Sequence, residues 1–234
     1  MQATGREEAR ISLAATLLAL ALLCVTPALL CATPALAAAP GLFGTLETRG
    51  ENLTAFQKWT DMLARYQWEE SRRDLKQPCR LSATMRCRQD DLKDLLSKLA
   101  GRPRSEQIVA INHFMNLAPY VTDMVNWGVP DYWATTREFM QKDGDCEDYA
   151  IAKYFSLKAL GVPADSMRIV IVEDMNLKTP HAVLAVYEAG ADKGVPLILD
   201  NQLPGPVKAS SILHYKPIYS INESAWWYHR NPVN

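Results

Sequence analysis

The chain has 234 residues, 48% of them hydrophobic and 22% charged, and its 25 basic and 26 acidic residues leave a net charge of −1. This balance excludes a disordered polyelectrolyte and gives no support to a broad electrostatic nucleic-acid interface. Gly and Pro occur 11 and 14 times, which excludes a fibrous or low-complexity chain.

Residues 1–37 have the pattern of a secretory signal peptide. An uncharged, almost entirely apolar run extends from Ile11 to Cys31, and Ala35-Leu36-Ala37 then supplies the small-x-small pattern for cleavage. A retained membrane anchor is the alternative, because about 20 apolar residues can span a bilayer. Cleavage would leave residues 38–234 as a single domain in an extracytoplasmic compartment, which is the periplasm for a signal of this bacterial type.

The first half of the mature chain predicts helices. Apolar residues recur at three- and four-residue steps between Leu53 and Glu70, which indicates an amphipathic helix. A turn and a second helix are expected over Cys79–Lys98, and a third helix begins at Ser105 and ends at Pro119.

The second half predicts one helix followed by strands. Asp145 is expected to cap a helix that runs to Gly161. Three runs rich in Val, Ile and Leu follow, at Arg168–Glu173, His181–Tyr187 and Pro196–Asp200. The order along the chain is several helices, then one buried helix, then a short meander of strands. This order indicates an α+β fold with an antiparallel sheet.

Cys146 follows Asp145 directly and is therefore the first residue of the predicted helix. A thiol at this position feels the partial positive charge of the helix N-terminus, which favours the thiolate. The position suits a cysteine nucleophile, although a small buried cysteine at a helix start is the structural alternative.

His181 and Asp200 are predicted to lie side by side. The connection from Glu188 to Val195 contains two glycines and is expected to close a hairpin, and the midpoint between the two residues, between Gly190 and Ala191, falls inside this connection. A carboxylate beside an imidazole fixes its tautomer and stabilises the imidazolium, as an acyl-transfer triad requires. A helix N-terminus packed against this edge of the sheet would bring Cys146 to the other ring nitrogen.

Four carboxylates surround the predicted nucleophile, at Asp143, Asp145, Glu147 and Asp148. Like charges so close oppose thiolate formation, by more than a helix dipole of about half a charge can offset. A hard divalent cation would remove this conflict, and ligands that are all oxygen favour calcium. We therefore expect Asp145 and Glu147 to lead a calcium site with Asp148 as a third ligand, a solvated acidic helix start being the alternative.

The other cysteines divide into two pairs. Cys24 and Cys31 leave with the signal peptide. Cys79 and Cys87 would be too far apart to bridge in a straight helix, but the polar stretch between them allows a turn and a disulfide. Cys146 is then the odd cysteine of a secreted chain, which makes it a candidate reactive thiol.

Four segments carry a family resemblance: Asp131–Thr135, Gly144–Tyr154, His181–Leu184 and Leu199–Asn201. Together they resemble the bacterial transglutaminase-like cysteine proteases and, more narrowly, the LapG type. The resemblance implies a papain-like, transglutaminase-type core with Cys146 as nucleophile, His181 as base and Asp200 as the orienting carboxylate. It also implies calcium dependence through the acidic residues that flank the cysteine, here Asp145 and Glu147.

The resemblance further implies a substrate and a partner. Members of this family cut a large surface adhesin near its N-terminus, at a paired-alanine site, and so release it from the outer membrane. An inner-membrane receptor for cyclic di-GMP holds such a protease inactive through its periplasmic domain when the nucleotide is abundant. The resemblance thus implies a calcium-dependent periplasmic cysteine endopeptidase that controls biofilm attachment.

The same residues leave other functions open. The triad could transfer the acyl group to an amine, as transglutaminases do, or hydrolyse a cell-wall amide. A non-catalytic calcium-binding module is the alternative from a different class. In the catalytic interpretations, the Cys146 N–H holds the oxyanion and Trp133 is a candidate second donor or a residue that lines the cleft. The aromatic residues 226–228 either form a docking patch or close the core.

Overall fold

The structure is a computed structural model that describes residues 41–72, 88–188 and 194–231. The predicted signal segment, the Cys79–Cys87 pair and the middle of the predicted hairpin connection lie outside these residues. Within the described ranges, no helix has the length and apolar character needed to cross a membrane.

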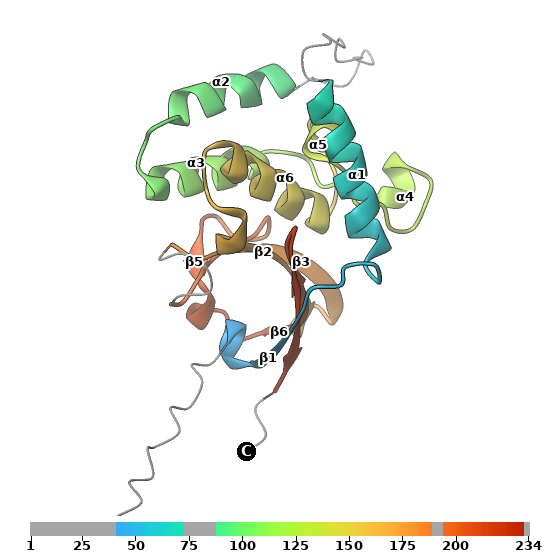
Figure 1. Cartoon of the computed structure of the whole chain (residues 1–234), viewed down its shortest axis with the longest axis vertical. Coiled ribbons are helices and arrows are strands. Elements are labelled where there is room, and N and C mark those ends of the chain that lie inside the picture. The colour runs from blue at the N-terminus through green and yellow to red at the C-terminus, as the bar shows by residue number, and fades with distance from the viewer. Residues whose placement is uncertain (1–40, 73–87, 189–193, 232–234) are drawn as a thin grey trace, which may run out of the picture. The chain divides into compact units, whose positions relative to one another are not determined.

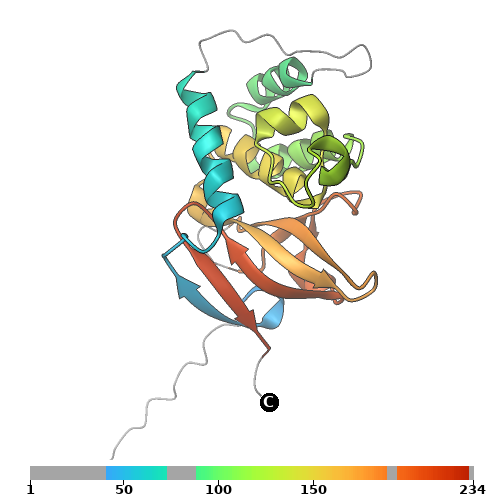
Figure 2. The ribbon, with the colours of Figure 1, turned by 90° about the vertical axis from the view of Figure 1, so that its right-hand side faces the viewer.

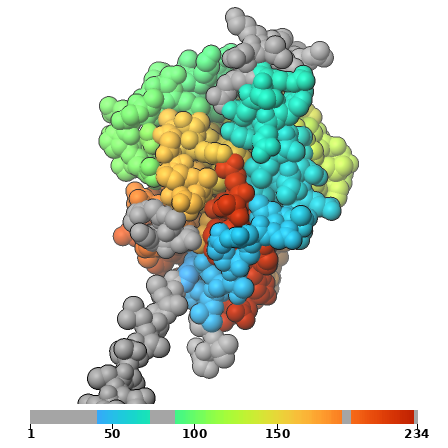
Figure 3. All heavy atoms as spheres, in the orientation of Figure 1, coloured from blue at the N-terminus to red at the C-terminus, as the bar shows by residue number. Residues whose placement is uncertain are grey.

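Seven strands of the described chain form one antiparallel sheet in the order β1-β7-β6-β2-β3-β4-β5. Their bounds are Leu46–Gly50 (β1), Met167–Asp174 (β2), Thr179–Val186 (β3), Leu197–Leu199 (β4), Val207–Lys208 (β5), Tyr215–Ile221 (β6) and Trp226–Arg230 (β7). The first and last strands lie side by side, blue beside red in Figure 3, because β1 pairs with β7 along its whole length.

The α-helices gather on one side of this sheet (Figures 1 and 2). They are Gln57–Ser71 (α1), Gln89–Leu99 (α2), Arg104–Asn116 (α3), Asp123–Asn126 (α4), Thr136–Lys142 (α5) and Cys146–Ala159 (α6), with short 3₁₀ turns at Leu42–Gly44 (η1), Ala164–Ser166 (η2) and Ala209–Ser211 (η3). Helix α6 packs against β2 and β3 and is buried at every residue from Glu147 to Leu157. Burial on all sides makes α6 the central helix of the core, although Glu147, Asp148 and Lys153 are among its buried residues.

The two faces of the sheet bury different side chains. On β3, Leu184 and Val186 face the helices, whereas Val183 and Ala185 pack in a second cluster on the opposite face, closed by η1 and η3. Both faces are covered, which explains the nearly continuous apolar runs of β2 and β3. His181 has the same parity as Val183 and therefore lies on the face opposite α6.

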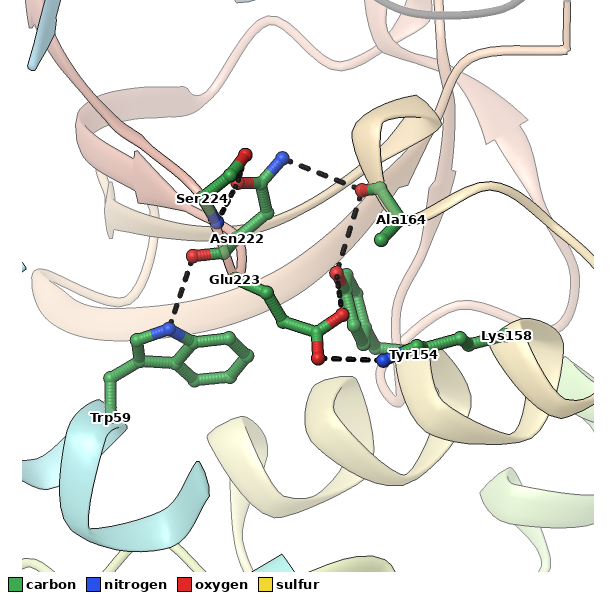
Figure 4. A network of polar contacts seen from close by, with 7 residues as sticks. All are labelled: Trp59, Tyr154, Lys158, Ala164, Asn222, Glu223 and Ser224. Carbon is green, nitrogen blue, oxygen red and sulfur yellow. Dashed lines mark hydrogen bonds and ion pairs between the residues drawn. The ribbon is translucent and has the colours of Figure 1, made fainter. Parts of the chain in front are cut away.

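A polar network anchors the C-terminal half of α6 (Figure 4). In the β6–β7 turn, the Glu223 carboxylate accepts hydrogen bonds from Lys158 Nζ at 2.6 Å and from the Tyr154 hydroxyl at 3.3 Å. The neighbouring Asn222 carbonyl accepts one from the Trp59 indole of α1 at 3.1 Å. These bonds tie α1 and α6 to the sheet.

The predicted α+β class is confirmed, and the helices and strands predicted from periodicity are present as α1, α2, α3, α6, β2, β3 and β4. The sheet is larger than the predicted meander, since β1, β5, β6 and β7 join it. The C-terminal aromatic residues form part of β7, where Trp227 is 6% exposed and closes the core while Tyr228 is 47% exposed.

Candidate active site

A tight turn between α5 and α6 places Cys146 at a helix start. Asp143 has a positive φ of 59°, Gly144 follows, and Asp145 is the extended N-cap of α6. Gly144 lies so close to Asp148 that a Cβ atom built on it would be 2.7 Å from the Cβ of Asp148. The structure therefore has Cys146 as the first helical residue, at the position where the sequence predicts it.

His181 and Asp200 form a buried hydrogen bond of 2.9 Å between Nε2 and Oδ1, with 3% and 1% of the two residues exposed. Oδ1 of Asp200 also accepts from the Gln202 N–H at 2.9 Å, and Oδ2 accepts from the Tyr215 hydroxyl at 2.6 Å. Burial acts to raise the pKa of Asp200, but these hydrogen bonds and the charge of His181 outweigh it and hold the pKa below its usual value. Asp200 is thus a fixed carboxylate on one side of the imidazole.

The register of β3 and β4 differs from the symmetric hairpin predicted from the sequence. Leu184 lies opposite Leu199, so that the register, continued by one residue, places Asp200 opposite Val183 instead of His181. The pairing is centred one residue later in the connection than the midpoint of His181 and Asp200, on which the prediction rests. Because the shift at Asp200 is two residues, it preserves parity, and His181 reaches Asp200 diagonally on the same face.

Cys146 and His181 line one cavity of about 670 Å³ together with Trp133, Pro180 and Tyr219. The short strand β4 pairs with β3 only from Leu184 onward, so in the described chain the residues 179–183 have no strand partner on that side. At this open edge Ala182 lines the same cavity as Cys146, and the Ala182 N–H acts to lower the pKa of the thiol. At this edge, His181 from the sheet face opposite α6 and Cys146 at the start of α6 line the same cleft.

The free nitrogen of the imidazole is Nδ1, because Nε2 is engaged with Asp200. Within the described residues, the hydrogen-bond neighbour of Nδ1 is the Gln202 amide nitrogen at 3.5 Å, a long contact. Nδ1 is therefore the nitrogen that could accept the thiol proton of Cys146 across the cleft. Trp133 is 7% exposed and lines the cleft, with its indole edge-on to Trp59.

The carboxylates around Cys146 oppose formation of its thiolate, as the sequence predicts. The Cys146 Sγ lies 3.2 Å from Glu147 Oε2. Burial, followed by the charge of Glu147 and its hydrogen bond and by the charge of Asp145, raises the pKa of the Cys146 thiol, and the Ala182 N–H only partly opposes this. Without a compensating positive charge, the thiol is held protonated.

Two groups of carboxylates beside the cleft could hold a metal ion, and they share Asp123. One group is Asp123, Asp131 and Glu147, and the other is Asp123, Asp145 and Asp148; in each, one oxygen per residue lies within 4.8 Å of the others. The three predicted ligands are thus divided between two groups that Asp123 connects. Asp143 belongs to neither group, since it faces Arg88 Nη1 at 3.5 Å.

Asp123 and Asp131 are the acidic residues that the sequence alone did not indicate as ligands. They lie far before Cys146 in the chain and have no spacing typical of a metal motif. Tertiary contacts bring the segment of Asp123 and Asp131 to the turn before Cys146. The Val121 N–H donates a hydrogen bond to the Gly144 carbonyl at 2.9 Å, beside an isolated Tyr120–Gly144 bridge. Asp131 also pairs with Lys58 at the rim of the cleft.

The donor atoms fit a hard cation. Oδ1 of Asp123 and Oδ1 of Asp145 are buried and have no hydrogen-bond partner among the described residues. Burial, followed by the charge of Asp145, raises the pKa of Glu147 to about 8, and burial likewise raises the pKa of Asp123 to about 6. Buried, unpartnered carboxylate oxygens that repel one another are the ligands that calcium prefers.

A cysteine at the start of a buried helix, facing a histidine–carboxylate pair at the edge of an antiparallel sheet, defines the class of papain-like cysteine peptidases. The model of the family described as bacterial transglutaminase-like cysteine proteinases matches residues 75–228, and the chain belongs to this family.

Solved structures of LapG from Legionella pneumophila are similar to the chain. One is 37% identical over 59% of this chain and 76% of that chain, with a TM-score of 0.54, and the calcium-bound form gives the same values. The EGTA-treated form is 37% identical over 60% of this chain and 75% of that chain, with a TM-score of 0.55. Among curated protein sequences, none matches the chain.

Proposed function

We propose that the chain is a calcium-dependent periplasmic cysteine endopeptidase that cleaves the N-terminal region of a large surface adhesin and so releases it. The periplasmic domain of an inner-membrane cyclic di-GMP receptor would hold it inactive. The observation that carries the catalytic part is the buried His181–Asp200 hydrogen bond at the cleft that contains Cys146. Adhesin and receptor are supported by the resemblance of the Cys146, His181 and Asp200 segments to the LapG type.

In the proposed reaction, His181 takes the thiol proton at Nδ1 and Cys146 attacks the scissile carbonyl carbon. The backbone N–H of Cys146, at the start of α6, donates to the oxyanion. His181 then protonates the leaving amine, and water hydrolyses the thioester to release the second product. Asp200 keeps Nε2 protonated, and the Tyr215 hydroxyl holds the carboxylate in place.

A calcium ion would be held by one of the two carboxylate groups that share Asp123, which are Asp123, Asp131 and Glu147 or Asp123, Asp145 and Asp148. When bound, it supplies the positive charge that neutralises the acidic residues on both sides of Cys146. With this repulsion removed, Cys146 can transfer its proton to His181 at a lower free-energy cost. The calcium-bound form of Legionella LapG supports the choice of ion.

The test is cleavage of N-terminal fragments of large repeat adhesins by the purified protein, with calcium or with a chelator. We expect one cleavage site, used only with calcium, and no cleavage by Cys146→Ala. Cleavage by Cys146→Ala at the wild-type rate would contradict the mechanism. Addition of the receptor's periplasmic domain should stop cleavage, and unchanged cleavage would contradict the proposed control.

Two further measurements separate this function from the alternatives. A primary amine added to the reaction should not appear in the products, because its incorporation would indicate an acyl transferase. A thiol-directed electrophile should modify Cys146 in a calcium-dependent way, whereas an unreactive Cys146 would indicate a binding module.

A further inference from the structure

Lys58 places a positive charge at the carboxylate cluster that the proposed reaction does not use. It is the second residue of α1, and its Nζ forms an ion pair with the Asp131 carboxylate, 73 positions later in the chain. Both residues line the same cavity as Cys146, and Lys58 is the one lysine or arginine among the described residues that line it. The pair therefore joins the start of α1 to the chain after α4 at the cleft.

Asp131 has two competing uses. With Asp123 and Glu147 it forms one of the two groups whose oxygens lie within 4.8 Å of one another and could hold a metal ion. The same carboxylate accepts the hydrogen bond of Lys58 through Oδ2. Both an ammonium group and a metal ion seek the lone pairs of a carboxylate, and the two cations repel each other. Calcium at this group therefore has to displace Lys58 from Asp131.

Helix α1 does not by itself favour a lysine at this position. A positive side chain in the first turn lies next to the partial positive charge of the helix N-terminus, which is unfavourable. The first turn of α1 contains no acidic residue to offset it. The side chains of Lys58 and Asp131 are 51% and 44% exposed, and ion pairs exposed to this degree add little to stability. The acidic residues of the cleft explain the position of Lys58 better than the stability of the fold does.

Asp123 provides a second sign that a cation belongs in this group. The residue is 1% exposed, and its Oδ1 has no hydrogen-bond partner among the described residues, whereas Oδ2 accepts from the Tyr132 N–H at 2.5 Å. Burial raises the pKa of Asp123 to about 6, and the charge of Lys58 acts against this rise. Lys58 thus compensates part of the negative charge but leaves a buried oxygen for a metal ion.

We propose that Lys58 is an internal competitor of calcium, which holds Asp131 in the metal-free protein and is released when calcium binds at Asp123, Asp131 and Glu147. The inference rests on the proposed calcium dependence of the protease. Lys58 weakens the affinity for calcium and in exchange stabilises the metal-free protein. The calcium concentration that activates the protease is therefore set in part by α1, a helix that contributes no residue to either carboxylate group.

Calorimetric titration of the purified protein with calcium tests this without a substrate. We expect the Kd of Lys58→Met to be about 3- to 15-fold lower than that of the wild type, because no ammonium group repels the ion, and the difference should shrink at high salt. Lys58→Arg keeps the charge and should bind calcium no more tightly than the wild type. An unchanged or higher Kd in Lys58→Met would overturn the proposal, and so would an equal decrease in Lys58→Arg.

Two comparisons show whether the effect passes through Asp131. In an Asp131→Asn background, Lys58→Met should lower the Kd by less than about 3-fold, and by less than it does alone, because the competition has lost its object. A decrease as large as in the wild-type background would overturn the proposal. Arg102→Met, at an exposed pair with Glu106 outside the cavity, is the matched control and should leave the Kd unchanged. A decrease equal to that of Lys58→Met would show that any surface cation has the effect and would overturn the proposal.

Thermal unfolding gives a second readout. With a chelator, Lys58→Met should melt about 1–3 °C below the wild type, and with saturating calcium the two should melt together, because calcium has already released Lys58. A deficit of the same size in both conditions would overturn the proposal. A wild-type protein that binds no calcium would contradict the proposed function as well, whereas wild-type binding that Lys58→Met leaves unchanged would contradict only this inference.

Discussion

Glu147→Gln removes one charge from the carboxylate cluster and keeps the shape of the side chain. Glu147 is 9% exposed, and burial, followed by the charge of Asp145, raises its pKa from 4.5 to about 8. The folded protein therefore binds this proton more tightly than the unfolded chain. Stability that is fully present below pH 4.5 is lost as the pH rises toward 8.

The size of the effect follows from this difference in pKa. Ionising the buried carboxylate above pH 8 costs on the order of 4–5 kcal/mol. Glutamine still has to be desolvated and part of the repulsion remains between the other acids, so we expect Glu147→Gln to recover about 2 kcal/mol. For a domain of this size that corresponds to a rise of about 4–8 °C in melting temperature.

The assay is thermal unfolding of wild type and Glu147→Gln at pH 5 and pH 8, each with a chelator and with calcium. With the chelator, the variant should be more stable at pH 8 and nearly equal to wild type at pH 5. Calcium should stabilise the wild type more than the variant, because a carboxylate ligand is lost. Glu106→Gln, at an exposed position on α3, is the control and should show none of these differences.

A variant that is less stable than wild type at pH 8 with chelator would refute the reasoning. So would a difference of the same size at both pH values, because it would show that the charge of Glu147 is not the cause. In either case the acidic cluster would be held by interactions other than the repulsion that a cation relieves.

Three further variants probe the triad and the turn before α6. Asp200→Asn should lower kcat about 10²- to 10⁴-fold in peptide cleavage, and a near-wild-type rate would exclude Asp200 as the orienting group. Tyr215→Phe removes a buried 2.6 Å hydrogen bond and should cost about 1–2 kcal/mol in urea unfolding, so an unchanged midpoint would contradict it. Gly144→Ala would displace Asp148 and should cost about 1–3 kcal/mol and weaken stabilisation by calcium, whereas Gly205→Ala, with no atom within 4 Å of the new Cβ, should be neutral.

The elements that the sequence predicts correctly are those with local signals. Helix α6 has an Asp145 cap and a long apolar run, and β2 and β3 are buried on both faces, so each can be predicted without its partners. The same local signals predict Cys146 at the helix start and His181 near Asp200. Their proximity depends only on parity along the strands, which a two-residue error in register does not change.

The elements that the sequence does not predict depend on tertiary pairing. Strand β1 is short and polar, lies at the edge of the sheet and has exposed or half-buried side chains, as a surface segment does. It forms a strand because β7 pairs with it. Strand β6 contains Pro217, which argues against a strand inside a sheet, yet the register shift between Ile171 and Val172 accommodates it opposite β2. No pattern within either segment carries this information.

Asp123 illustrates the same limit at the site. It is the first residue of the short helix α4, after the Thr122 N-cap, and nothing within its own segment relates it to Cys146. Its carboxylate accepts a 2.5 Å hydrogen bond from the Tyr132 N–H, and its own N–H donates to Asp145 at 3.3 Å. Such a ligand is found only when the chain between α3 and α6 is folded back on the Cys146 turn.

The carboxylate cluster and the His181 imidazole are held by separate sets of hydrogen bonds. The carboxylate cluster belongs to the hydrogen-bonded unit that holds the nucleophile, because Asp148 accepts hydrogen bonds from the N–H groups of Ala134 at 2.7 Å and Asp145 at 3.4 Å. The His181 imidazole is held instead by Asp200, whose carboxylate also accepts hydrogen bonds from the Tyr215 hydroxyl at 2.6 Å and from the Gln202 N–H at 2.9 Å. A cation in the cluster would therefore change the charge of Cys146, whereas Asp200 would set the orientation of the base. The proposed calcium dependence and the orientation of the base would thus be governed by separate residues, so that a change in one need not alter the other.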